Sequence, residues 1–387
     1  PIGIYRSLVL QNDQGEPVDA PHGTFLLESA KISAEGESAA WDRYSFIGAS
    51  SRSTLTTVDG AVHWQGRTPV EAIAKTLQML YTEPDPTLPP LTSGLVGYLG
   101  WDVVRHWEHL PFPPADDVNL PEFALNMVSD MAIHDNKDGT VLLVANAINF
   151  NGTSENVDGA YQDAVARLHS MLRRLQRGAT ATTSTLSGVA DVDRKVREDV
   201  TLTWSEQGFK DAIDRSKKNI IDGDVFQIVL SRRFEAETNA KALDVYRVLR
   251  QSNPSPYMYL FNFEDSNGTP FHIVGSSPEA LVTLKDGIAS THPIAGSRPR
   301  GATREEDLAL AEELLADQKE RSEHLMLVDL ARNDLSRIAK PGTVSVDQFM
   351  IIERFSHIMH ISSAVSAELD PQFSAYDVLR VAFPAGT

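Results

Sequence analysis

Apolar and polar residues alternate along two stretches in the first half of the chain, as they do in strands with one buried face. The stretch 44–64 alternates around an Asp59-Gly60 dipeptide, and the stretch 130–148 alternates around the residues NKDG. Each pattern predicts a β-hairpin. Between them, the run SGLVGYLG at 93–100 is apolar and rich in glycine. This run predicts a buried strand that another backbone approaches closely.

The first part of the chain ends with apolar residues spaced as in a helix. From 155 to 176 the apolar positions that share one helical face are Tyr161, Val165, Leu168 and Leu172. Gly178 is a plausible stop for this helix. We therefore interpret 1–178 as one mixed α/β domain. Residues 179–200 are rich in Ala, Thr and Ser and then in charged residues, which indicates a linker or an exposed crossover.

The remaining residues, 201–387, are interpreted as a second domain. Thr203 with Glu206 predicts a capping box for a helix that ends at Gly223. One face of this helix comprises Phe209, Ile213, Ser216 and Ile220. Strands are predicted for Val225–Phe234 and near 257–263, 271–275 and 280–284.

A second capping box, Thr303 with Glu306, predicts the start of one long helix. Its core-facing residues are Leu308, Ala311, Leu314 and Leu315. Strands do not alternate strictly with helices along the chain, so a parallel βαβ array is not expected. The pattern favours an α+β fold with large antiparallel sheets.

Composition and charge restrict the function. The chain has 387 residues, no cysteine, and 35 basic against 53 acidic residues, which gives a net charge of 35 − 53 = −18. We expect no binding to nucleic acid or to anionic membranes, because both need a cationic surface. Cysteine-based disulfides and nucleophiles are excluded. No apolar run is long enough to span a bilayer and no signal peptide is visible, so we expect a cytoplasmic protein.

An acidic run stands out in the predicted long helix. Glu313, Asp317, Glu320 and Glu323 are spaced by 4, 3 and 3, which would put four carboxylates on one helical face. A bound cation would relieve their repulsion, and carboxylates without His or Cys suit Mg²⁺ better than Zn²⁺. A solvated helix face explains the same spacing, and spacing alone favours that simpler explanation.

Two further motifs could carry chemistry. In PIAGSRPRG at 293–301, Gly296 permits a close backbone approach, and the N–H groups beside Ser297 could bind an anion. A loop stiffened by two prolines explains this motif equally well. In ERFSHIMH at 353–360, either His357 or His360 could act as a general acid or base. A hydrogen-bonded core histidine is an equally good interpretation.

Taken in order, these segments resemble the chorismate-utilising enzymes. The resemblance rests on the two motifs above, on the run DQKERSEHLMLVDLARNDL and on FPAGT. It extends to FLLESAKI, GLVGYLGWD, NPSPYMYLF and VGSSPEALV, and so covers nearly the whole chain. Within this family the motifs are most similar to the large subunit, component I, of the anthranilate synthase branch. The expected fold is therefore the α+β fold of that family, with antiparallel sheets flanked by helices.

The resemblance implies an activity and its partners. In the anthranilate branch ammonia adds to C2 of chorismate, the C4 hydroxyl leaves, and elimination of pyruvate makes the ring aromatic. A glutamine amidotransferase subunit, component II, would supply the ammonia for this step of tryptophan biosynthesis. A Mg²⁺ ion held by glutamates would bind the ring carboxylate.

The resemblance also assigns roles to particular residues. Glu323 falls on a Mg²⁺ ligand and Glu320 on a catalytic position of the same site, which reverses the simpler explanation of the acidic run. Gly296 and Ser297 fall where the family contacts chorismate, although the family usually has Thr at the position of Ser297. His360 falls on the active-site histidine, a candidate for proton transfer at the leaving hydroxyl or in the elimination.

Two positions separate the branches of the family. Gln227 stands in the substrate site where isochorismate and salicylate synthases carry a Lys that activates water, and Gln cannot act as a base. Ala295 stands where aminodeoxychorismate synthases carry a nucleophilic Lys. Both residues point to the ammonia-using anthranilate branch. An aminodeoxyisochorismate synthase without the lyase step remains an alternative, as does a tryptophan- or partner-binding fragment without catalysis.

Feedback inhibition by tryptophan is implied as well. Inhibited members of the family bind tryptophan between the segments equivalent to Leu26–Ser29 and Asn253–Met258. Ser29 would be a polar contact, and Pro256, Tyr257 and Met258 would supply backbone groups and an apolar wall. A plain contact between domains is the alternative for both segments.

We expect both ends of the chain to be truncated. The family continues beyond FPAGT with a second Mg²⁺ glutamate and with residues that bind the chorismate carboxylates. On this resemblance the chain holds only part of an active site.

Overall fold

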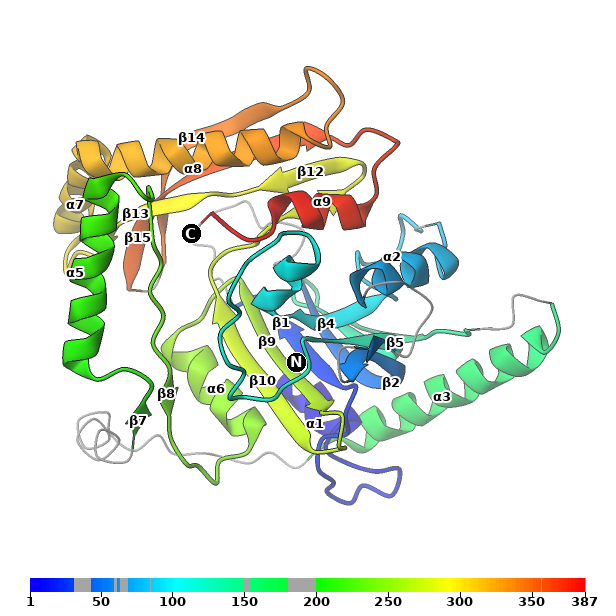
Figure 1. Ribbon diagram of the computed structural model, residues 1–387. Helices are drawn as coiled ribbons and strands as arrows, with labels where there is room; N and C mark the ends of the chain where they lie inside the picture. Colours follow the sequence, from blue (N-terminus) through cyan, green and yellow to red (C-terminus); the bar gives the residue numbers. More distant parts are fainter. Residues whose placement is uncertain are drawn as a thin grey trace. The chain divides into compact units, whose positions relative to one another are not determined.

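The computed structural model describes residues 1–30, 43–58, 61–62, 69–83, 85–148, 154–179, 200–355 and 357–386 (Figure 1). The described residues form two compact units. One unit combines Pro1–Ala179 with Ala242–Gly386. The other lies within 180–241, of which 200–241 are described.

An eight-stranded antiparallel sheet forms the first layer of the larger unit. Its strands are β1 (Phe25–Glu28), β2 (Tyr44–Val58), β3 (Ala61–Val62), β4 (Leu95–Leu99), β5 (Phe123–Asp135), β6 (Val141–Ala145), β9 (Tyr257–Glu264) and β10 (Pro270–Ser277). The order is β10-β9-β1-β2-β5-β4, with β3 paired to β2 and β6 paired to β5. Helices α1 (Ile2–Leu8), α3 (Val157–Arg177) and α6 (Ala242–Ser252) contribute Tyr5, Met171 and Tyr246 to one core of this sheet. A second core contains Phe25, Phe46 and Phe261.

Two shorter elements complete this part of the unit, α2 (Pro69–Met79) and the 3₁₀ helix η1 (Trp101–His106). They contribute Ile73 and Val103 to a small core with Phe123 of β5. The indole N–H of Trp107 donates a hydrogen bond of 2.7 Å to the hydroxyl of Tyr376. This bond links the end of η1 to α9 (Ala375–Ala382) near the C-terminus.

A five-stranded antiparallel sheet forms the second layer. Its strands are β11 (Thr283–Lys285), β12 (Ile288–Thr291), β13 (Ile294–Pro299), β14 (Ser345–Arg354) and β15 (Ile358–Glu368). Helices α7 (Arg304–Ala316) and α8 (Gln318–Ser336) pack on it, as Figure 1 shows for α8. Leu314 of α7 meets Met359 and Ile361 of β15, and Val328 of α8 packs with Val365. The predicted α+β fold with large antiparallel sheets is therefore confirmed.

The elements predicted from strong local patterns are present. Strands β5 and β6 form the predicted hairpin, β4 lies within 93–100, and α3 ends at Gly178. Strands β2 and β3 also pair, but the turn residues Asp59 and Gly60 lie outside the described residues. Thr303 caps α7 by accepting a hydrogen bond from the N–H of Glu306, but the Glu306 carboxylate accepts from the N–H of Ala302, so the predicted capping box is formed only in part.

Strand β5 approaches the backbone of β4 closely at Gly97, which leaves no room for a side chain there. A Cβ atom at this position would lie 1.9 Å from the carbonyl oxygen of Ala124 in β5. Gly97→Ala is expected to lower the free energy of unfolding by about 1–3 kcal/mol, because backbone must move to admit the methyl group. Urea unfolding measures this change. Gly3→Ala is the control, since a Cβ there meets nothing within 4 Å; equal midpoints for the two variants would contradict the close approach.

The predicted N-terminal cap of the helix in the smaller unit is wrong. Its helix α5 (Glu206–Asp222) is capped by Ser205, which accepts from the N–H of Gly208, and not by Thr203. The Thr203 hydroxyl instead accepts from the N–H of Arg233, next to the paired strands β7 (Thr201–Leu202) and β8 (Phe234–Glu235). Gly223 ends α5 in the left-handed conformation, as predicted.

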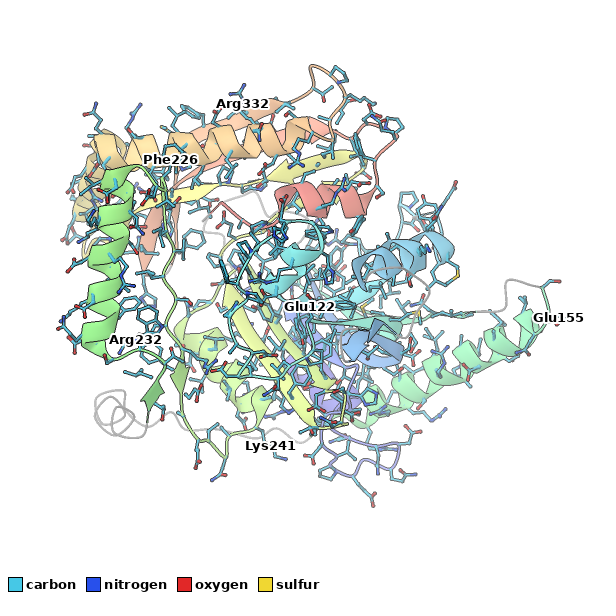
Figure 2. The ribbon with its side chains drawn as sticks, in the orientation of Figure 1. Glu122, Glu155, Phe226, Arg232, Lys241 and Arg332 are labelled. Atoms are coloured by element: carbon cyan, nitrogen blue, oxygen red, sulfur yellow. The ribbon has the colours of Figure 1, made fainter. Side chains whose placement is uncertain are left out.

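The predicted strand Val225–Phe234 is absent from the structure. Only its last residue enters a strand, β8, and the apolar residue Phe226 is 92% exposed (Figure 2). An apolar run can extend as a strand only when a neighbouring strand completes its backbone hydrogen bonds. Sequence pattern does not reveal whether such a neighbour is present.

The single long helix predicted after Thr303 is also wrong. The chain leaves the helical conformation at Asp317, which ends α7 and caps α8. Glu313 and Asp317 consequently do not continue one stripe with Glu320 and Glu323. Both instead pair with Arg298 of β13.

The strand pairing joins segments from both predicted domains. Strands β9 and β10 come from 201–387, but they extend the sheet that begins in 1–178. The linker prediction, 179–200, falls almost entirely outside the described residues. The division of the chain into domains 1–178 and 201–387 stays a prediction.

Candidate active site

Strands β13 and β15 bring together residues more than sixty positions apart. Ser297 lies opposite His360 in the register, next to an irregularity between Ala295 and Ser297. The Ser297 hydroxyl is 3.0 Å from Nδ1 of His360, and the same nitrogen is 3.2 Å from the carbonyl oxygen of Gly296. Because a carbonyl oxygen can only accept, this geometry favours the proton on Nδ1. The basic nitrogen is then Nε2, which suits a general acid or base.

Gly296 brings the first turn of α8 close to this pair. Its φ angle is +78°, in the left-handed region that glycine adopts without strain. A Cβ atom at this position would lie 3.3 Å from Oε2 of Glu320 and 3.3 Å from Cδ1 of Ile361. The structure thus brings four predicted residues together: Gly296, Ser297, His360 and Glu320.

Glu323, the predicted metal ligand, lies one helical turn beyond Glu320. Spacing of three puts the two carboxylates on the same side of α8. Among the residues that the structure describes, no group of three or more His, Cys, Asp or Glu side chains could hold a metal ion. Mg²⁺ is usually bound by one or two carboxylates together with substrate and water. The carboxylates of Glu320 and Glu323 are therefore compatible with a Mg²⁺ site of this kind.

Glu353 is a residue of the site that sequence reasoning missed. It lies opposite His360 in the pairing of β14 with β15, so both side chains occupy one face of the sheet. Phe355 contacts the imidazole edge-on, with ring centroids 5.5 Å apart. The motif ERFSHIMH contains Glu353 and His360, and recognition of a hairpin within it would have shown their proximity.

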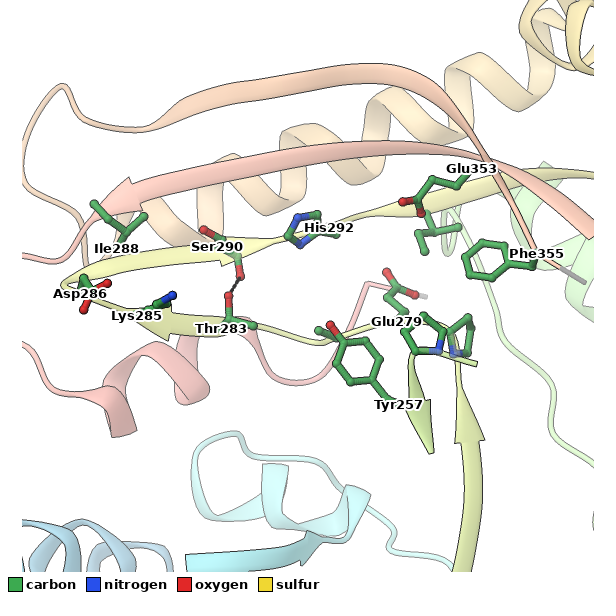
Figure 3. A pocket seen from close by; sticks show the side chains of 14 residues that line it. Tyr257, Glu279, Thr283, Lys285, Asp286, Ile288, Ser290, His292, Glu353 and Phe355 are labelled. Carbon is green, nitrogen blue, oxygen red and sulfur yellow. Dashed lines mark hydrogen bonds between the residues drawn. The ribbon is translucent and has the colours of Figure 1, made fainter. Parts of the chain in front are cut away.

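A cavity of about 500 Å³ opens on the same side of the sheet as Glu353 (Figure 3). Tyr257, Glu279, His292 and Phe355 are among the residues that line it. Burial raises the pKa of Glu279 to about 7, with a smaller contribution from the charge of Glu353. Neither this cavity nor Glu279 was anticipated from the sequence.

The two segments predicted to bind tryptophan lie side by side. Strand β1 pairs with β9, so that Glu28 is opposite Met258, and the N–H of Ala30 donates to the carbonyl oxygen of Ser255 at 3.0 Å. Ser29 is therefore next to Pro256 and Tyr257 along the paired backbones. Met258 is only 1% exposed and belongs to the core, whereas Tyr257 is 38% exposed and lines the cavity.

Three other predicted positions have different surroundings. His357 is exposed, and its Nε2 lies 3.1 Å from the carbonyl oxygen of Ser252, so the two histidines of the motif do not form a pair. Ala295 is buried in β13. Gln227 belongs to the smaller unit, so the structure does not place it in the site.

None of the described helices is both long and apolar enough to cross a membrane.

Comparison with known proteins places these features in a family context. The family model described as chorismate binding enzyme matches residues 24–387. Anthranilate synthase component 1 of Arthrobacter globiformis is 56% identical over 100% of this chain and 71% of its own length. The protein of the same name from Mycolicibacterium smegmatis is 49% identical over 100% of this chain and 72% of its own.

Solved structures agree with these sequence relatives. Anthranilate synthase component I from Streptococcus pneumoniae superposes with a TM-score of 0.72 at 29% identity, over 92% of this chain and 75% of that one. The menaquinone-specific isochorismate synthase of Escherichia coli gives a TM-score of 0.61 at 14% identity, over 98% of this chain and 71% of that one. The second likeness concerns the fold alone.

Proposed function

The chain belongs to the family of chorismate binding enzymes, and on this premise we propose that it catalyses the anthranilate synthase reaction. Chorismate and ammonia would give anthranilate, pyruvate and water. The name component 1 in its relatives implies a second component, and we assign to that partner the release of ammonia from glutamine. The observation that carries the proposal is the 56% identity along the whole chain.

The site residues suit the chemistry of this reaction. Departure of the C4 hydroxyl needs a proton, and the later elimination of pyruvate needs a base. His360 can serve in either step through Nε2, because Ser297 and Gly296 hold its Nδ1. Gly296 and Ser297 would contact chorismate beside the imidazole, and Glu320 would complete that wall of the site.

Glu323 would hold Mg²⁺, with Glu320 lining the same site. The bound ion would supply positive charge for the ring carboxylate of chorismate, which an acidic protein of net charge −18 needs at this point.

The experiment is a product analysis. The protein is incubated with chorismate, Mg²⁺ and ammonium, and anthranilate is followed by its fluorescence, with the products separated by chromatography. Anthranilate together with pyruvate supports the proposal. Aminodeoxyisochorismate without pyruvate would assign the chain to the branch that lacks the lyase step, and binding of tryptophan without turnover would assign it to a non-catalytic role.

Tryptophan is proposed as a feedback inhibitor that binds at the paired segments of β1 and β9. The pairing of Glu28 with Met258 supports this proposal, because it puts Ser29 next to Pro256 and Tyr257 along the paired backbones. Coupling between this site and chorismate would be reciprocal, so that chorismate opposes tryptophan.

Ser29→Ala is expected to raise the tryptophan concentration for half-inhibition several-fold and to spare turnover without tryptophan. The reason is the loss of one hydrogen bond, worth about 1 kcal/mol. Inhibition curves at fixed chorismate measure the effect, and Ser336→Ala at the end of α8 is the matched control. Met258→Ala should weaken inhibition too, but this core residue also costs about 2–5 kcal/mol of stability on truncation. Unchanged curves for both variants would place the inhibitor elsewhere.

A further inference from the structure

Arg298 joins three elements at the edge of the candidate site. From β13 its guanidinium donates to Oε1 of Glu313 on α7 at 2.8 Å and to Oδ2 of Asp317 at 2.9 Å. A third donor bonds to the carbonyl oxygen of Ser297, also at 2.9 Å. All three bonds use the planar fork of the guanidinium, which an ammonium group cannot reproduce.

Asp317 contacts both Arg298 and the backbone of Glu320. The second oxygen of Asp317, Oδ1, accepts from the N–H groups of Lys319 at 2.9 Å and Glu320 at 3.2 Å, and so caps α8. The N–H of Glu320 and then the guanidinium of Arg298 keep the pKa of Asp317 below its usual range. The same carboxylate thus holds the first turn of α8 and is itself held by β13.

The two branches of this contact differ in their surroundings. The side chains of Arg298 and Asp317 are 19% and 32% exposed, whereas that of Glu313 is 61% exposed. An exposed ion pair contributes little, so the branch to Glu313 should matter less. The carboxylate of Asp317 also accepts from the N–H of Glu320, so the branch to Asp317 reaches the first turn of α8 directly.

We propose that Arg298 is a positioning residue for the reaction, because its bond to Asp317 fixes the first turn of α8 and sets the carboxylate of Glu320 against Gly296. This inference rests on the proposed function. Arg298 occupies the position after Ser297, so the strand that presents the hydroxyl to His360 also carries the side chain that holds the helix. Consecutive residues of β13 therefore align the Ser297–His360 pair with the start of α8.

The first test is kinetic. Arg298→Gln should lower kcat about 10-fold or more with a much smaller change in KM, because a misplaced group acts mainly on the transition state. Arg298→Lys should recover only part of the loss. Asp317→Asn keeps a capping oxygen but loses the charge, and combining it with Arg298→Gln should add little to the loss from Arg298→Gln alone.

Two variants serve as matched controls. Glu313→Gln removes the exposed branch of the contact, and Arg332→Gln removes an equal charge from an exposed pair with Asp329 on α8 (Figure 2). Both should keep kcat within about twofold. Losses in Arg298→Gln and Asp317→Asn that multiply, or an equal loss in Glu313→Gln, would overturn the proposal.

The second test does not depend on turnover. Hydrogen exchange at residues 318–324 should be faster in Arg298→Gln than in the unsubstituted protein, and unchanged in Glu313→Gln and Arg332→Gln. Unchanged exchange in Arg298→Gln would overturn the positioning role even if activity fell. Absence of chorismate turnover in the unsubstituted protein would instead overturn the proposed function, and the exchange result would still decide whether Arg298 holds the start of α8.

Discussion

Glu323→Gln is expected to lower the turnover of chorismate about 100-fold or more, as loss of a major electrostatic group at a reaction centre does. The amide is nearly isosteric with the carboxylate, so the fold should persist. The substitution removes a negative charge that would hold Mg²⁺, and Gln is a weaker ligand for a hard cation. The measurement is turnover as a function of Mg²⁺ concentration, together with calorimetric binding of Mg²⁺.

Asp329→Asn is the control for this experiment. It makes the same chemical change on the same helix, but the side chain of Asp329 is 75% exposed and pairs with Arg332. Turnover should remain within about twofold of the unsubstituted protein. Near-normal turnover of Glu323→Gln at saturating Mg²⁺ would show that the metal is held by other residues.

His360→Gln should lower kcat about 100-fold or more, because general acid–base catalysis by one group contributes at least this factor. Gln retains an amide that can bond to Ser297 and to the carbonyl oxygen of Gly296, so the pairing of β13 with β15 should survive. The measurement is the initial rate at saturating chorismate.

His357→Gln tests whether position in the site, and not the imidazole itself, accounts for the loss. His357 lies three residues earlier in the same motif, but it bonds to the carbonyl oxygen of Ser252 and does not reach the Ser297 hydroxyl. Its substitution should leave kcat nearly unchanged. Equal losses in the two variants, or near-normal turnover in His360→Gln, would refute the assigned role.

Local signals in the sequence were sufficient for several elements. The residues NKDG and the alternation around them predicted the hairpin of β5 and β6, and the helical period predicted α3 and its end at Gly178. The glycine-rich run 93–100 predicts a close approach of another backbone, and within it Gly97 lies against Ala124. The hairpin and the helix depend on neighbours within a few residues, so the local pattern carries the information for these two elements.

The same local reasoning failed where a distant partner decides the outcome. Thr203 has the spacing of a capping residue, but it bonds to Arg233 while Ser205 caps the helix. Spacing also suggested one acidic stripe, yet the helix is interrupted at Asp317, where Arg298 binds two of the four carboxylates. A polar side chain forms hydrogen bonds with whichever group the fold brings near it. The spacing of residues along the sequence does not specify that group.

Local patterns were enough to predict many of the helices and strands, though not the loop before β8 or the break at Asp317, and the resemblance indicated the family and the residues to examine. Only the tertiary structure decided that Ser297 meets His360, that Glu353 faces the same imidazole and that β9 completes a sheet begun by β1. The reason is physical. A hydrophobic period records which face of a strand or helix is buried, but the element that buries it is selected by packing and hydrogen bonding across the whole chain.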